Sequence, residues 1–255
     1  MKPALIFFLP AIVWAGAACG HAIDGNDAAD SATVTAQQTA DTIEADSLRV
    51  ETFPVDFLPP GDEATRYTSL SEEDFRIVAE ELGVEVAAIK AVVSIEAGSH
   101  MRGFAAPGVP IVNFDASMYK TYGPKAPDKK GDPNAKVPDG LSGSQLKKWT
   151  RLTNAMKQNA EGAMMGTFWG MFQIGGFHYK KCGCKDVREF VRVMSESEFS
   201  QLELFAKFIT ASGMLPDLKS KNWAGFARKY NGASYAKKGY HTKMANAYKK
   251  FKGKA

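Results

Sequence analysis

The first 66 residues lack any pattern that buries a hydrophobic core, and this confines the folded part of the chain to the residues after them. Residues 20–66 are poor in large apolar side chains and rich in Ala, Thr, Asp, Gln and Pro. Such a composition cannot offset the entropy lost on folding. We therefore expect a disordered acidic linker over residues 19–66. The remaining residues, 67–255, are enough for one folded domain.

The residues before the linker have the features of an export signal. Lys2 provides a positive start, residues 4–16 are apolar apart from one proline, and small residues follow. The apolar run is too short to span a bilayer, which indicates a signal peptide over residues 1–18. Two interpretations remain open: ordinary cleavage at Ala15-Gly16-Ala17, or a lipoprotein box whose Cys19 is acylated. We expect an exported protein that is periplasmic, anchored in the membrane through Cys19, or secreted.

Charge divides the chain at the same place. Residues 1–66 hold three basic and ten acidic side chains, a net charge of −7, so the whole-chain charge of +4 leaves +11 on residues 67–255. A basic domain on an acidic tether favours an anionic polymer as partner, such as cell wall, lipopolysaccharide or nucleic acid. A soluble basic surface without a partner fits the charge too. The lysines gather on one C-terminal helix without an interleaved aromatic platform, which argues against nucleic acid.

The cysteines and histidines show no metal-binding spacing. Cys182 and Cys184 have no second cysteine pair, and the histidines at 21, 100, 178 and 241 are scattered. A disulfide between Cys182 and Cys184 would be strained, so we expect two packed thiols. We expect neither a metal ion nor a cofactor.

The stretch from Ile89 to Phe104 carries the strongest chemical signal. Its apolar residues at 89, 92, 93 and 95 fall on one helix face, and Glu96 occupies the last turn before Gly98. An acid behind three apolar turns is partly desolvated, which raises its pKa. Each unit of pKa rise corresponds to about 1.4 kcal/mol in favour of the neutral form. A carboxyl group still protonated near neutral pH is what a glycosidase needs to protonate a leaving sugar oxygen. The alternative is a solvated glutamate at a helix end.

A second acid comes after a short apolar segment. Residues 111–114 are predicted to form a strand, and Asp115 is the next residue. We expect Asp115 to be the partner carboxylate of Glu96; alternatively, it caps a helix over residues 116–122. Residues 123–144 are rich in Gly, Pro, Lys and Asp and are predicted to form a long mobile loop.

Residues 166–176 combine four glycines with aromatic side chains. Glycine allows the backbone to approach a ligand closely, and the rings of Trp169 and Phe172 offer stacking faces for sugars. Gln173 offers a donor and an acceptor to hydroxyl or acetamide groups. The alternative is a tight hydrophobic turn in the core. A later turn presents Tyr230 and Asn231 just before Gly232.

The remaining patterns predict helices and little else. Helical patterns cover residues 69–82, 85–96, 144–159, 186–194, 197–212, 222–230 and 235–251. Many helices against one short strand pair indicate a mainly α domain, a helical bundle with a small β element.

Taken together, these stretches resemble the N-acetylmuramidase domain of phage endolysins, a branch of the lysozyme-like superfamily. The resemblance covers about residues 70–251. Its marks are the segments 93–96 with Gly98, 103–104, 108–115, 169–174, 182–183, 201–202 with Phe205, and 226–232. It implies a lysozyme-like α+β fold, peptidoglycan as substrate, and cleavage of the β-1,4 bond from N-acetylmuramic acid to N-acetylglucosamine. It also implies that Glu96 is catalytic and that Gln173, Tyr230 and Asn231 line the glycan groove.

One departure from the family concerns the second acid. Members commonly have Phe-Glu with a histidine two residues later, where this chain has Phe114-Asp115-Ala116-Ser117. We hypothesise that Glu96 is the general acid and that Asp115 delivers water with inversion. One alternative is a lytic transglycosylase, which needs no second carboxylate and leaves 1,6-anhydro ends. Another is a wall-binding lipoprotein without catalysis. We expect a monomer.

Overall fold

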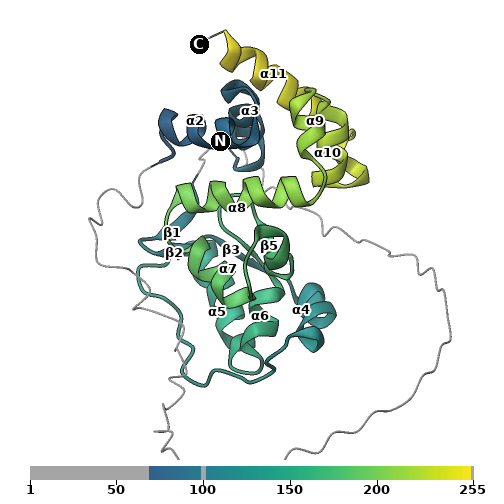
Figure 1. The fold of residues 1–255 in the computed structure, drawn as a ribbon. Coiled ribbons are helices and arrows are strands. Elements are labelled where there is room, and N and C mark those ends of the chain that lie inside the picture. The colour runs from purple at the N-terminus through teal and green to yellow at the C-terminus, as the bar shows by residue number, and fades with distance from the viewer. Residues whose placement is uncertain (1–68, 99–101, 254–255) are drawn as a thin grey trace, which may run out of the picture. The chain divides into compact units, whose positions relative to one another are not determined.

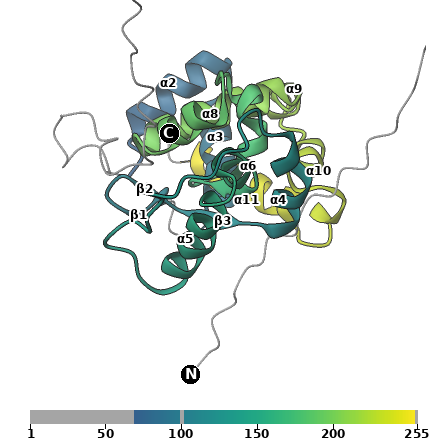
Figure 2. The ribbon, with the colours of Figure 1, turned by 90° about the horizontal axis from the view of Figure 1, so that it is seen from below.

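The computed structural model describes residues 69–98 and 102–253, which are mainly helical (Figures 1 and 2). The helices are α2 (Glu72–Leu82), α3 (Val86–Glu96), α4 (Ala116–Tyr122), α5 (Gly143–Met156), α6 (Ala160–Met165), α7 (Val187–Met194), α8 (Glu198–Ala211), α9 (Leu215–Lys219), α10 (Trp223–Asn231) and α11 (Tyr240–Lys252). The expected mainly α fold is confirmed. The expected signal peptide, the candidate acylation site and the linker lie outside the described residues. Among the helices that are described, none is long and apolar enough to cross a membrane.

Two helices joined by a tight turn place Glu96 at the end of a buried helix. Ser71 begins α2 with a capping box, and Gly83 ends it with a left-handed φ of +61°. The next helix, α3, starts after Glu85, and its apolar residues Ala88, Ile89, Ala91, Val92 and Val93 are buried. It packs against α2 and α11. The apolar face predicted around Ile89 is therefore the face that fixes α3 in the core.

Two small antiparallel sheets come after α3. The first pairs β1 (Phe104–Ala106) with β2 (Val109–Pro110), and the second has the order β3 (Val112–Phe114), β4 (Thr167–Trp169), β5 (Ile174–Gly175). The strand predicted over residues 111–114 is confirmed as β3, although two sheets form where the sequence predicts one strand pair. Val112 lies opposite Trp169 and Phe114 opposite Thr167. The turn between β4 and β5 and the residue after β3, Asp115, therefore lie at opposite ends of the second sheet.

The segment between α4 and α5 is irregular, as predicted, apart from the 3-10 turn η1 (Gly123–Lys125). It is nevertheless fastened to its neighbours. The Asp132 amide donates to the Met156 carbonyl at 2.9 Å, and the Ala160 amide donates to the Lys130 carbonyl at 2.9 Å. These bonds join the irregular segment to α5 and α6, so its composition predicts the loop but not its anchors.

Helix α8 lies between two groups of elements (Figure 1). On one side are α2, α3, α9, α10 and α11, and on the other are the sheets and α4 to α7. Its apolar residues Leu202, Phe205 and Ile209 are fully buried, as their spacing predicts. Two polar residues of the same helix, Glu198 and Gln201, are also buried, so α8 brings hydrogen-bonding groups into the core.

Candidate active site

Glu96 is the last residue of α3, and its side chain is half-buried. Burial raises the pKa of its carboxyl group from the ordinary 4.5 to about 7, while a hydrogen bond from Asn231 opposes the rise. In that bond Asn231 Nδ2 donates to Glu96 Oε1 at 2.9 Å. The raised pKa agrees with the desolvation that the apolar turns of α3 predict. A large share of Glu96 is therefore protonated at pH values up to about 7.

Tyr230 and Asn231 connect Glu96 to the turn between β4 and β5. The Tyr230 hydroxyl donates to the Phe172 carbonyl at 2.8 Å, and the next residue, Asn231, holds Glu96. Burial, and after it the charge of Glu96, raises the pKa of Tyr230 well above its ordinary value, so its hydroxyl keeps its proton and remains a donor. Two stretches that are far apart in the sequence thus meet at one place.

Gln173 lies on this turn in a backbone conformation that is uncommon outside glycine. Its φ is +49°, in the left-handed region that costs about 1 kcal/mol for a residue with a Cβ atom. Its backbone amide and its Nε2 both donate to the Gly170 carbonyl, at 3.2 and 2.8 Å. The side chain is half-buried. Strain of this kind persists only where the surroundings hold it, and it gathers at functional sites.

Trp169 and Phe172 lie in the core, where they are 0% and 2% exposed. Trp169 Nε1 donates to the Met164 carbonyl at 3.0 Å, and the Phe172 ring stacks on Phe205 with centroids 4.3 Å apart. These contacts correct the expectation that the two rings offer stacking faces to sugars. The two residues instead belong to a tight hydrophobic turn, which was the alternative interpretation. Their packing in the core supports the turn that carries Gln173.

Asp115 is the N-cap of α4. Its Oδ1 accepts from the Ser117 amide at 2.8 Å, the Ser117 hydroxyl at 2.5 Å and the Met118 amide at 3.1 Å. Burial raises the pKa of Asp115, but these hydrogen bonds and the charge of Arg151 together outweigh it and hold the pKa below the ordinary value. Asp115 is therefore ionised at neutral pH and serves the local backbone, whatever other role it has.

Tyr240, at the start of α11, is a candidate site residue that the sequence pattern did not indicate. Its pKa is raised first by burial and then by the charge of Glu96, which places its hydroxyl in the electrostatic neighbourhood of the acid. The ring is half-buried. A single tyrosine at the start of a lysine-rich helix gives no sequence signal, because only the packing of α11 against α3 brings it to Glu96.

The other candidate titratable groups are structural. Cys182 and Cys184 are free and buried, as expected, and burial raises the pKa of their thiols to about 12 and about 11. Burial lowers the pKa of His178 to about 4. Within the described ranges, no group of three or more His, Cys, Asp or Glu side chains is placed to hold a metal ion. His21 and His100 lie outside those ranges.

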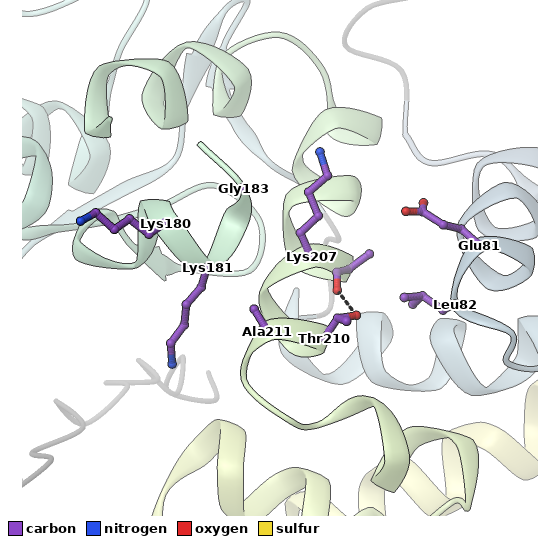
Figure 3. Close-up of a pocket in the computed structure, with 9 residues that line it drawn as sticks. Glu81, Leu82, Lys180, Lys181, Gly183, Lys207, Thr210 and Ala211 are labelled. Carbon is purple, nitrogen blue, oxygen red and sulfur yellow. Dashed lines mark hydrogen bonds between the residues drawn. The ribbon is translucent and has the colours of Figure 1, made fainter. Parts of the chain in front are cut away.

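Two pockets lie apart from Glu96. One, of about 330 Å³, is bordered by α2, α8 and η2 (Gly176–Cys182), and Figure 3 shows Lys180, Lys181 and Lys207 around it. The other, of about 290 Å³, borders the β1–β2 hairpin and Glu198. Neither contains Gln173 or Asn231, so the candidate site is defined by its hydrogen bonds and by the environment of its acid.

Comparisons with known proteins identify a family and a similar solved structure. The family model of the muramidases, described as N-acetylmuramidase, matches residues 85–252. A solved structure described as a Burkholderia AP3 phage endolysin is similar, with 34% sequence identity, a TM-score of 0.61, and coverage of 72% of this chain and 71% of that one. No curated protein sequence matches the chain.

Proposed function

The chain belongs to the N-acetylmuramidase family, and on that premise we propose that it cleaves the β-1,4 bond between N-acetylmuramic acid and N-acetylglucosamine, with Glu96 as the general acid. The family and the likeness to a phage endolysin make the protein a lysozyme-like glycoside hydrolase that acts on peptidoglycan. One observation supports the assignment of the acid above all. Glu96 is a half-buried carboxyl group with a pKa of about 7, so it can hold a proton at neutral pH and release it.

The hydrogen bond from Asn231 suits this role because it distinguishes the two oxygens of Glu96. Oε1 accepts from Asn231 Nδ2, so the proton of the neutral acid resides on Oε2. Oε2 then donates that proton to the glycosidic oxygen as positive charge develops on the muramic acid ring. Gln173 and Asn231 provide amide groups for the hydroxyl and acetamide groups of the glycan. Tyr230 holds the Gln173 turn in place.

The group that activates water is the second part of the proposal. Asp115 is ionised at neutral pH because its pKa lies below the ordinary value, so it can accept a proton from water, although the lowered pKa makes it a weaker base. This charge supports water delivery with inversion. Its Oδ1, however, caps α4, and Asp115 stands at the end of the sheet opposite the Gln173 turn. This position favours a second candidate, a lytic transglycosylase in which the muramic 6-hydroxyl attacks C1. That reaction requires no second carboxylate.

Product analysis on purified peptidoglycan tests these assignments. Mass spectrometry of the digest distinguishes hydrolysis, which adds one water per bond cleaved, from ring closure, which leaves 1,6-anhydro ends. We expect muramic acid at the new reducing ends with water added, and no product from Glu96→Gln. Anhydro ends throughout would refute hydrolysis. Intact peptidoglycan with the wild type would refute catalysis and favour a wall-binding protein.

We propose further that the protein reaches the cell wall by export and is anchored through acylated Cys19. The apolar segment before Cys19 and the polar residues after it support this. Labelling with a fatty acid in wild type and in Cys19→Ser tests the anchor. We expect the label in the wild type alone, and an unlabelled wild type would favour ordinary signal cleavage.

A further inference from the structure

We propose that Gln201, in the buried face of α8, is a positioning residue that sets the Gln173 turn in register with Gly103, the residue before β1. The inference rests on the proposed function, because it concerns how the same site is held together. Its basis is a set of hydrogen bonds from one side chain to three separate segments.

Gln201 is 0% exposed and uses both ends of its amide. Oε1 accepts from the Met171 amide at 2.7 Å, and Nε2 donates to the Met194 carbonyl at 2.8 Å and to the Gly103 carbonyl at 3.3 Å. A primary amide has two N–H donors and one carbonyl acceptor, so every hydrogen-bonding group of this side chain has a partner. No apolar residue of similar size can replace these contacts.

The backbone at two glycines is shaped around this amide. A Cβ atom at Gly103 would lie 2.2 Å from Gln201 Oε1, and one at Gly170 would lie 2.7 Å from the same atom. Any residue larger than glycine would displace the amide at both places. One turn earlier on α8, Glu198 Oε1 accepts from the Gly103 amide at 2.8 Å. Gly103 is therefore held by both its N–H and its carbonyl group.

These contacts reach the site in two directions. Met171 lies two residues before Gln173, in a turn that Tyr230 holds from its other side through the Phe172 carbonyl. Gly103 lies seven residues after Glu96. Gln201 thus joins Gly103, the residue before β1, to the turn that presents the glycan-binding amide. Because a displacement of about 1 Å in a positioning contact is enough to disturb a bound geometry, the amide is placed to affect glycan binding without touching substrate.

A purely structural role predicts a different result. If Gln201 only satisfies buried polar groups, its loss lowers stability and leaves the kinetics of the folded protein unchanged. If it positions the turn, its loss weakens glycan binding through Gln173 and raises KM more than it lowers kcat. The limb of the pH profile set by Glu96 stays in place in either case, because Asn231 still contacts the acid.

The test is Gln201→Met, which keeps length and burial and removes the hydrogen bonds. It is assayed on soluble peptidoglycan chains well below its melting temperature. The matched control is Asn159→Ala, which removes the cap of α6 and so lowers stability elsewhere. We expect KM to rise about tenfold in Gln201→Met, kcat to fall less than threefold, and neither to change in Asn159→Ala. An unchanged KM in folded Gln201→Met, or an equal rise in Asn159→Ala, would overturn the proposal.

Amide hydrogen exchange gives a readout that does not depend on activity. In the full-length wild type we expect the Met171 amide to exchange only on global unfolding, because its acceptor is buried. We expect Gln201→Met, but not Asn159→Ala, to speed exchange at Met171 and Gln173. Rapid exchange at Met171 in the wild type would overturn the proposal even if the variant does not fold. An inactive wild type with a protected Met171 would instead count against the proposed function and leave this arrangement standing.

Discussion

Glu96 and Asp115 are two carboxyl groups with opposite surroundings. Glu96 is half-buried, accepts a side-chain hydrogen bond from Asn231, and has a pKa raised to about 7. Asp115 accepts three hydrogen bonds on one oxygen, and its pKa is lowered. Desolvation dominates at the first group, and hydrogen bonding outweighs it at the second. The first environment keeps a transferable proton, and the second keeps a fixed negative charge.

Glu96 and Asp115 also differ in how far along the sequence their hydrogen-bond partners lie. Asn231 is 135 residues from Glu96, whereas Ser117 and Met118 are two and three residues from Asp115. Holding Glu96 requires the whole fold, while capping α4 requires only a local turn. An acid whose partners are distant is one whose geometry the tertiary structure maintains, and this is the arrangement expected of a reacting group.

The strongest test of this contrast is Glu96→Gln, which keeps the shape of the side chain and removes the transferable proton. We expect a loss of about 1,000-fold or more in peptidoglycan cleavage, because general acid catalysis contributes roughly 100- to 10,000-fold. Turbidity loss of purified walls and product analysis measure it. The matched control is Glu203→Gln on α8, another glutamate whose pKa burial raises, and it should retain full activity. Equal activity in wild type and Glu96→Gln would remove Glu96 from the mechanism.

The Glu96→Gln variant also tests the contrast through the pH dependence of the free energy of unfolding. The folded-state pKa of Glu96 lies above its unfolded value, so the wild type is stabilised by the bound proton below pH 4.5 and loses that stability as the pH rises through 7. Glu96→Gln lacks this dependence. We expect it to gain about 2 kcal/mol relative to wild type between pH 4.5 and pH 8, after allowance for partial exposure. Urea unfolding at several pH values measures the difference, and a constant difference would contradict the raised pKa.

Features that depend on local sequence could be predicted, whereas features that depend on contacts between distant segments could not. Helix α3, its apolar face and the desolvation of Glu96 could be predicted, because periodicity and position are local properties. The cap formed by Asp115 is predicted as an alternative for the same reason. The burial of Trp169 and Phe172 could not be predicted, because the same glycine-rich aromatic sequence pattern occurs both in ligand-binding grooves and in hydrophobic cores. Gln201 carries a weak signal, a polar residue at core spacing in α8, but two of its three partners, Met171 and Gly103, lie on distant segments.

The contact between Asn231 and Glu96 can be tested directly with Asn231→Ala. Because the hydrogen bond lowers the pKa of Glu96, its loss should move the alkaline limb of the activity profile to higher pH. We expect activity at pH 6 to fall about tenfold through lost positioning, which corresponds to about 1.4 kcal/mol. Asn222→Ala is the control, because it removes the cap at the other end of α10. If the alkaline limb of the activity profile stays at the same pH in Asn231→Ala, Asn231 does not contact Glu96 in solution.

The last test decides between the two roles of Asp115, cap and base. Asparagine is as good an N-cap as aspartate, so Asp115→Asn keeps the hydrogen bonds to Ser117 and Met118 and removes only the charge, whereas Asp115→Ala removes both. If the cap is the main role, Asp115→Asn should stay within threefold of wild-type activity, and Asp115→Ala should lose about 1 kcal/mol of stability with similar activity in the folded fraction. Kinetics and thermal unfolding of the two variants decide this.

A loss of about 100-fold in Asp115→Asn at unchanged stability would instead make the charge essential, and it would support Asp115 as the base that delivers water. The contrast between the two acids would then be one between proton donor and proton acceptor, and hydrolysis would be favoured over ring closure.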